Sequence, residues 1–207
     1  MPNRRDFLQQ ATLAGAATLV PPLALAQSGQ SAVTAMANEM TAEEVRALLK
    51  LEPHPTCGYV RITYIGADKI PAGALHAPFE AGRPVGSALY FMMTAERPVH
   101  LHRIRNDQLY HYYMGDPIEV FMLRGEGKVE RHLVGPDLRA GHTVQLFIPG
   151  NTFHTARIIG KRNWFLGAST EWPGVEPQDV EIGKLDELAA QYPSVAKEIR
   201  EIAASAK

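Results

Sequence analysis

The sequence predicts an all-β protein, a sandwich or barrel of short strands with short helices at both ends. The first observation is a series of short apolar runs, rich in Val, Ile, Tyr and Phe, spaced by about ten residues. The second is the turn signals between them, in a chain with 17 Gly and 15 Pro. The third is that no segment of helical-crossover length separates the runs, which disfavours a parallel α/β sheet. The expected strands are 58–65, 88–93, 99–102, 109–114, 118–123, 128–133, 143–148, 155–159 and 164–168.

Composition limits the possible classes of protein. The chain of 207 residues is 45% hydrophobic, which suits a single globular domain. Its formal net charge of -1 lacks the basic excess of a nucleic-acid-binding protein, so we expect no nucleic acid partner. The single cysteine, Cys57, excludes an intrachain disulfide framework and a cysteine-rich zinc site.

The N-terminal segment is expected to be a signal peptide for export. Arg4 and Arg5 precede an apolar run at 11–25, and a small-x-small cleavage site ends at Ala26. The run is shorter than the roughly 20 residues that span a bilayer, so we expect no membrane attachment after cleavage. The expected domains are a signal peptide at 1–26, a flexible leader at 27–40 and a single domain at 41–207.

The paired arginines resemble the twin-arginine export motif. That resemblance implies a periplasmic or secreted protein that is exported already folded, often with a cofactor loaded beforehand. In such an oxidising compartment Cys57 is expected to be buried, reactive or paired between chains.

Helices are expected on either side of the strands. Thr41 and Glu44 form a capping-box pattern that opens a short helix, which ends before Pro53. In the tail, Leu185, Leu188 and Ala189 have helical spacing. Ser194 is expected to cap a last helix, whose apolar face carries Val195, Ile199 and Ile202.

Three histidines suggest a metal site. His100 and His102 flank one residue, so strand alternation would place both imidazoles on one face. The turn at 149–151, in which Asn151 can adopt a positive φ, would aim His154 back at a neighbouring strand. Three imidazoles from two strands make a facial site with open positions, and Gln108 is a candidate fourth ligand through its amide oxygen.

These residues resemble the two motifs of the cupin superfamily. The matching positions are His100, His102, Gln108 and Gly115, followed by Pro149, Asn151 and His154. A narrower resemblance over 45–192 is to the small cupin family of unassigned function often labelled cupin type 5. It is carried by Leu51-Glu52-Pro53-His54-Pro55, Leu89-Tyr90-Phe91-Met92-Met93-Thr94 and the segment from Asp107 to Pro117.

The resemblance implies a cupin jelly-roll β-barrel. Relatives usually have Glu where Gln108 stands, a residue other than His where His154 stands, and no His100. The family therefore implies neither a particular metal nor a reaction for this chain.

Other side chains are candidates for binding or catalysis. Tyr59 and Arg61 alternate onto one face, where Arg61 could bind a carboxylate or phosphate or form a structural ion pair. Tyr110 and Tyr112 share the face of Gln108 and are candidate catalytic residues, although an aromatic core is the alternative. His111 is expected on the opposite face in a structural role.

The sequence therefore predicts an exported protein that binds one divalent metal ion, either Fe, Mn, Ni, Cu or Zn, and a small-molecule ligand. A metal-dependent oxygenase or isomerase is the first hypothesis. The alternatives are a metal-free sugar epimerase-like enzyme, with His102 as base and Tyr110 or Tyr112 as acid, and a non-catalytic periplasmic binder of a small ligand. A homodimer is expected because a small barrel leaves sheet edges to cover.

Overall fold

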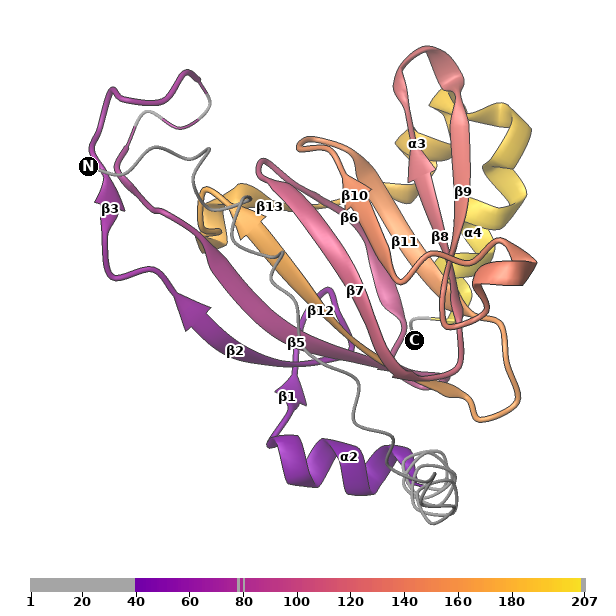
Figure 1. The fold of residues 1–207 in the computed structure, drawn as a ribbon. Helices are drawn as coiled ribbons and strands as arrows, with labels where there is room; N and C mark the ends of the chain where they lie inside the picture. The colour runs from indigo at the N-terminus through magenta and orange to yellow at the C-terminus, as the bar shows by residue number, and fades with distance from the viewer. Residues whose placement is uncertain (1–39, 78, 80, 206–207) are drawn as a thin grey trace, which may run out of the picture. The chain divides into compact units, whose positions relative to one another are not determined.

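The computed structural model describes residues 40–77, 79 and 81–205. The predicted signal peptide and nearly all of the predicted leader lie outside the described residues. Strands dominate the described part and form two antiparallel sheets, with short helices at each end of the chain (Figure 1). The prediction of an all-β fold with short terminal helices is confirmed.

The larger sheet has six strands in the order β1-β2-β5-β12-β7-β10. Strand β12, which comes late in the chain, lies between β5 and β7 and pairs with both. Its strands are β1 (Glu52–Pro53), β2 (Tyr59–Ile65), β5 (Ser87–Thr94), β7 (Asp107–Gly115), β10 (Gln145–Ile148) and β12 (Trp164–Trp172).

The second sheet has five strands in the order β13-β6-β11-β8-β9. They are β6 (Val99–Ile104), β8 (Ile118–Leu123), β9 (Val129–Val134), β11 (Phe153–Ile158) and β13 (Val180–Ile182). A separate two-stranded ribbon joins β3 (Lys69–Ile70) to β4 (Arg83–Pro84).

Each of the nine predicted strands corresponds to a strand of the structure. The run 118–123 matches β8 residue for residue. The strand predicted at 164–168 was too short, because β12 continues to Trp172. The extension carries two polar residues that line a cavity, Ser169 and Glu171. The short strands β1, β3, β4 and β13 were not predicted, since two or three residues show no periodicity.

The main core lies between the two sheets. Phe91, Tyr110 and Phe165 contribute from the larger sheet, and Ile118 and Val120 contribute from the smaller one. All are buried, as alternation requires of residues that point inward from facing sheets.

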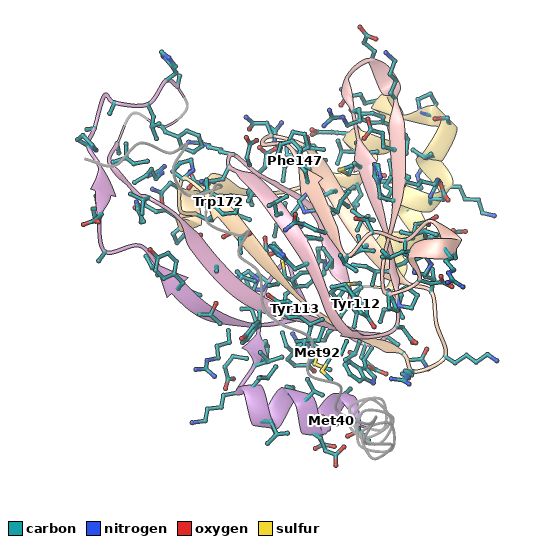
Figure 2. All side chains as sticks on the ribbon, in the orientation of Figure 1. Met40, Met92, Tyr112, Tyr113, Phe147 and Trp172 are labelled. Atoms are coloured by element: carbon teal, nitrogen blue, oxygen red, sulfur yellow. The ribbon has the colours of Figure 1, made fainter. Side chains whose placement is uncertain are left out.

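Helices cover the outer faces of both sheets. Helix α2 (Ala42–Leu49) packs Val45 against Met92 of β5, and Figure 2 shows Met92 on the side of the sheet where Met40 lies. Helices α3 (Leu185–Gln191) and α4 (Ala196–Ser205) place Leu188 and Ile199 against Leu101 and Phe121 of the smaller sheet. In Figure 1 these two helices lie behind β8 and β9.

The helix ends agree with the prediction at one terminus and differ at the other. Thr41 caps α2 in a complete capping box with Glu44, as predicted. The predicted cap at Ser194 was wrong: α4 begins at Ala196, and Ser194 lies within a 3-10 turn, Pro193–Val195, that precedes it. Among the described helices, none has both the length and the hydropathy required to cross a membrane.

Candidate functional site

A cavity of about 450 Å³ is lined by residues from both sheets. Strands β2, β5, β7 and β12 form one side, and β6 and β13 form the other. Most of the lining is aliphatic or aromatic. A polar patch interrupts it, and its members are Cys57, His102, Gln108, Tyr110, Ser169 and Glu171.

His102 presents an imidazole lone pair to the cavity. Its Nδ1 lies 2.8 Å from the backbone carbonyl oxygen of His100. A carbonyl only accepts, so Nδ1 carries the proton and Nε2 is the lone-pair nitrogen. The Cys57 Sγ lies 4.0 Å from that Nε2. Burial, followed by the nearby His154, lowers the pKa of His102 to about 3, so the ring is neutral at neutral pH.

The turn at Pro149–Asn151 places His154 beside His102, as predicted. Asn151 adopts the expected positive φ of 59°, and its backbone N–H donates to the carbonyl of Ile104 at 2.7 Å. This bond holds the turn against the end of β6. Strand β11 then runs antiparallel to β6 with His154 directly opposite His102, and the ring centroids are 4.5 Å apart.

His154 lies behind the cavity wall and does not line the cavity. Its exposed fraction is 0%, and its Nδ1 lies 3.0 Å from the carbonyl oxygen of Thr152. The proton is therefore on Nδ1, and Nε2 accepts a hydrogen bond from the Tyr110 hydroxyl at 3.0 Å. Burial lowers the pKa of His154 to about 4, which keeps it a neutral acceptor.

Tyr110 stands between His154 and the cavity. It lines the cavity from β7, as its predicted face requires. Burial, followed by the neighbouring Cys57 and Glu171, raises the pKa of Tyr110 well above its ordinary value. The hydroxyl is therefore protonated at neutral pH, where it can donate one hydrogen bond and accept others.

Gln108 also lines the cavity, but its amide is turned away from the predicted role. The Ser169 hydroxyl donates to Gln108 Oε1 at 3.2 Å, and Gln108 Nε2 faces His154 Nε2 at 3.5 Å. Gln108 thus directs an N–H group, and not an oxygen, at the imidazole.

The expectation that His100 and His102 share one face of β6 was wrong. His154 of β11 pairs with His102 of β6, and Ala156 pairs with Val99. Between these two pairs β11 advances by two residues and β6 by three, which is a β-bulge. The extra residue breaks the alternation, so Val99 and His102 both face the interior. His100 does not line the cavity.

The predicted substrate residues on β2 also lie away from the cavity. Tyr59 packs against the cluster that Val45 and Met92 form between α2 and β5. The Arg46 and Arg97 guanidinium groups lie over its ring. Arg61 is exposed and donates to the carbonyl of Leu49 at 3.2 Å. These odd-numbered residues share a face, as predicted, but Val60 and Ile62 are the ones that line the cavity.

The remaining two candidates, Tyr112 and His111, do not line the cavity either. Tyr112 packs against the core and donates from its hydroxyl to the carbonyl of Gly115 at 2.9 Å, outside the cavity lining. His111 hydrogen-bonds Thr170 at 2.9 Å and stacks on Tyr113, away from the cavity, which agrees with the structural role expected for it.

The described residues do not fit the predicted metal site. Among them, no group of three or more His, Cys, Asp or Glu side chains is placed to hold a metal ion. His100 and His154 lie outside the cavity lining, and Gln108 presents its amide nitrogen. The Tyr110 hydroxyl occupies the lone pair of His154. The set of three imidazoles and one amide oxygen is therefore not assembled in this structure.

Glu171 is a cavity residue that the sequence analysis missed. It is buried on β12 opposite Gln108 and Ser87, and the Ser87 hydroxyl donates to its carboxyl at 2.6 Å. Burial raises the pKa of Glu171. The alternation of Ser169 and Glu171 could have identified this face if the predicted strand had not ended at Ala168.

Cys57 completes the polar patch as a free thiol. Burial raises its pKa to about 11, so it is a neutral thiol at neutral pH and not a reactive thiolate. By solvent exposure Cys57 is half-buried in the cavity wall, so it is neither fully buried nor, as a neutral thiol, activated.

Comparison with solved structures shows two that share most of this fold. A hypothetical protein from Leishmania major is 26% identical with a TM-score of 0.71, over 78% of this chain and 98% of that one. A protein from Shewanella oneidensis is 23% identical with a TM-score of 0.69, over 79% of this chain and 97% of that one.

A search of curated proteins finds no match. The family described as "Cupin superfamily (DUF985)" matches residues 43–183, which include both sheets and every cavity residue discussed above. The chain therefore belongs to the DUF985 family of the cupin superfamily.

Proposed function

We propose that this protein is an enzyme that moves a proton on a small molecule held in the cavity, in a reaction of the isomerase or epimerase type. One observation carries the proposal. The lone pair of His102 Nε2 faces the same cavity as the Tyr110 hydroxyl, and backbone and side-chain contacts fix both groups. A base and an acid that share one cavity are what proton transfer next to a carbonyl requires.

In this proposal His102 Nε2 takes a proton from a carbon next to the carbonyl of the ligand. The electron pair of that C–H bond moves to the carbonyl oxygen. The Tyr110 O–H turns from His154 Nε2 to this oxygen and hydrogen-bonds or protonates it. His102 then returns the proton to the former carbonyl carbon while the hydroxyl proton of the neighbouring carbon passes to Tyr110, which completes an isomerisation. Return of the proton to the original carbon after the enol has turned over in the cavity gives the epimer. The Nδ1–H bond to the His100 carbonyl stabilises the transient imidazolium.

His154 acts through Tyr110 and is a positioning residue. Its neutral Nε2 holds the Tyr110 hydroxyl at 3.0 Å and so fixes where the phenol oxygen meets the ligand. His102 is a weak base because burial lowers its pKa to about 3. Polarisation of the ligand oxygen by Tyr110 is therefore essential to the reaction.

The test is proton exchange in deuterated buffer. Three ketone or aldose probes, 2-octanone, 4-methylcyclohexanone and glyceraldehyde, are followed by NMR for exchange next to the carbonyl. We expect catalysis with at least one probe, and a loss of about 10²-fold or more in His102→Gln and in Tyr110→Phe. His111→Gln, on the opposite face of β7, is the matched control and should retain the rate.

Exchange no faster than in buffer for all three probes would refute the enzyme proposal and favour a non-catalytic binder. Exchange that survives His102→Gln would show that this imidazole is not the base. Glyceraldehyde as the preferred probe would favour the sugar-modifying alternative, whereas either ketone would favour an apolar substrate.

Metal binding by the histidine pair is the second candidate function. Both imidazoles donate Nδ1–H to a backbone carbonyl, which is the arrangement typical of metal-ligating histidines. Their rings also lie 4.5 Å apart. Two imidazoles supply fewer ligands than the predicted site, so ligand or water would have to complete the coordination. The Tyr110 hydroxyl would also have to release His154 Nε2.

Elemental analysis tests this candidate, before and after incubation with iron, manganese, nickel, copper and zinc. If the pair binds metal, His102→Gln and His154→Gln should each abolish the metal content, while His100→Ala should not change it. Protein that takes up no metal from any of the five would contradict this candidate.

A further inference from the structure

The charges around the cavity are uneven. Its acidic lining residues are Glu171 and Glu176, and no Lys or Arg of the described part of the chain lines it. The Glu176 carboxylate forms an ion pair with Arg83. Arg83 is buried outside the lining, and its second terminal nitrogen binds Asp179 at 2.9 Å, so both terminal nitrogens are paired with carboxylates of the protein. The lining therefore offers a ligand a carboxyl group and no cationic side chain.

The histidines do not supply the missing positive charge. His102 has its pKa lowered to about 3, chiefly by burial. Burial also lowers the pKa of His54, the other imidazole in the lining. An anionic ligand would lose its hydration and meet Glu171 without a compensating cation, which is strongly unfavourable.

The aliphatic part of the lining extends to exposed positions. Ile62 and Ile65 of β2 are 61% and 56% exposed, and Ile182 of β13 is 56% exposed, yet all three line the cavity. These side chains come from both sheets and continue inward to Leu89 and Ile104. A ligand that covers them gains the hydrophobic free energy of removing apolar surface from water.

The inner polar patch suits an uncharged oxygen. The Tyr110 hydroxyl donates to His154, so its oxygen is left to accept a hydrogen bond from a ligand, and Glu171 faces the same cavity from the neighbouring strand. Burial raises the pKa of Glu171, so this carboxyl takes up a proton more readily than an exposed one, and when protonated it can donate as well as accept. A cationic ligand would find one carboxyl group that already accepts from Ser87, which is poor compensation for full dehydration.

We propose that the cavity binds an uncharged molecule with an aliphatic or alicyclic body and a hydroxyl or carbonyl group at its inner end. The proposal rests on the proposed function, because it names the substrate class for the same cavity. The volume of about 450 Å³ lies within the range of roughly 300–1,000 Å³ of small-molecule sites. Carboxylates, phosphates and nucleotide-linked sugars are excluded as substrates.

The experiment compares three probes with the same carbon chain and different charge. Octan-1-ol, octanoate and octylammonium are titrated into the protein by calorimetry at about pH 7, where they carry 0, -1 and +1. We expect octan-1-ol to bind with a Kd at least about tenfold lower than either charged probe, a ratio that corresponds to about 1.4 kcal/mol.

Glu171→Gln is the informative variant, because it keeps the size and polarity of the side chain and removes its ability to ionise. We expect it to reduce the preference for octan-1-ol over octanoate several-fold. Glu181→Gln is the matched control: Glu181 lies on β13, pairs with Arg103 at 2.7 Å outside the cavity lining, and should leave the preference unchanged. If Glu171→Gln fails to fold, the ranking of the three probes by the wild-type protein decides alone.

Octanoate binding as tightly as octan-1-ol would overturn the inference, and so would octylammonium binding most tightly. Failure of the enzyme proposal is separable, since calorimetry reports binding without turnover. The expected ranking without proton exchange would retain the substrate class and refute catalysis. Proton exchange combined with a preference for octanoate would support catalysis and refute the uncharged substrate class.

Discussion

At the scale of single residues, burial decides the protonation of the site. His102 and His154 lie in the same interior and have pKa values lowered to about 3 and 4. Both rings therefore remain neutral acceptors well below the ordinary titration range of histidine, about 6.5. Tyr110 and Cys57 are kept protonated by the same burial. The polar patch is thus uncharged at neutral pH except where Glu171 ionises.

These shifts predict how stability depends on pH. The unfolded chain protonates its histidines as pH falls below about 6.5, whereas the folded protein resists until about pH 3 to 4. The unfolded state therefore binds more protons in this window, and the free energy of unfolding should fall as pH is lowered through it. We expect urea denaturation in the presence of a chelator to show this fall, with a smaller slope in His102→Gln.

The contribution of Glu171 to this pH dependence has the opposite sign. Its raised pKa makes the folded state bind more protons than the unfolded state above about pH 4.5. The difference between wild type and His102→Gln removes this common contribution and isolates the histidine. The exposed His132→Gln is the control. Parallel curves for wild type and His102→Gln would contradict the lowered pKa of His102.

At the scale of elements, local sequence signals set the helix and turn that frame the sheets. Thr41 caps α2 by accepting from the backbone N–H of Glu44 at 3.2 Å, while the Glu44 carboxylate accepts from the N–H of Thr41 at 2.8 Å. The helix packs Val45 and Leu51 onto the outer face of β5, away from the cavity.

Thr41→Ala should therefore reduce stability without changing the cavity. We expect the free energy of unfolding to fall by about 1 kcal/mol, the usual cost of losing such a cap. Urea denaturation measures the loss, and the Kd for octan-1-ol should stay within error of wild type. A change in octan-1-ol affinity would contradict the assignment of α2 to the outer face.

At the scale of the whole molecule, one sheet edge is exposed and apolar. Beyond the pairing of β1 with Tyr59 and Val60, residues 61–65 of β2 pair with β5 on one side and have no second strand among the described residues. Ile62, Tyr64 and Ile65 on this segment are more than half exposed. An unpaired edge of this kind can pair with a second copy.

We expect a homodimer formed by β2 of two copies. Tyr64→Lys should convert it to a monomer, because a two-fold axis would bring the two lysines close together. Light scattering measures the mass. Tyr113→Lys, an exposed position on the inner strand β7, is the control and should remain dimeric. A wild-type mass of one chain, or a dimer that survives Tyr64→Lys, would contradict this arrangement.

Export is a second prediction for the whole chain. The paired arginines and the cleavage site at Ala26 predict a mature N-terminus at Gln27 and loss of export when Arg4 and Arg5 are both replaced by lysine. Cell fractionation and N-terminal sequencing check both statements. An intact Met1 on protein from the cell envelope would contradict them.

The sequence alone determined the features that depend on neighbouring residues. Alternation predicted that Gln108 and Tyr110 share a face of β7, and that His111 lies on the other face. The capping box and the positive φ of Asn151 were likewise predictable, because a few consecutive residues specify each of them. The strand pattern and the family motifs identified the cupin fold.

Only the tertiary structure decided which residues meet in the cavity. The bulge that removes His100 is a property of the register between β6 and β11, which no local pattern encodes. Burial of His154 behind Tyr110 depends on how the two sheets face each other. The entry of Glu171 into the site depends on β12 inserting between β5 and β7. Contacts between residues 44 or more positions apart depend on sheet packing and register. The alternation within each strand is local, so it could place a side chain on a face but could not show which other side chains it meets there.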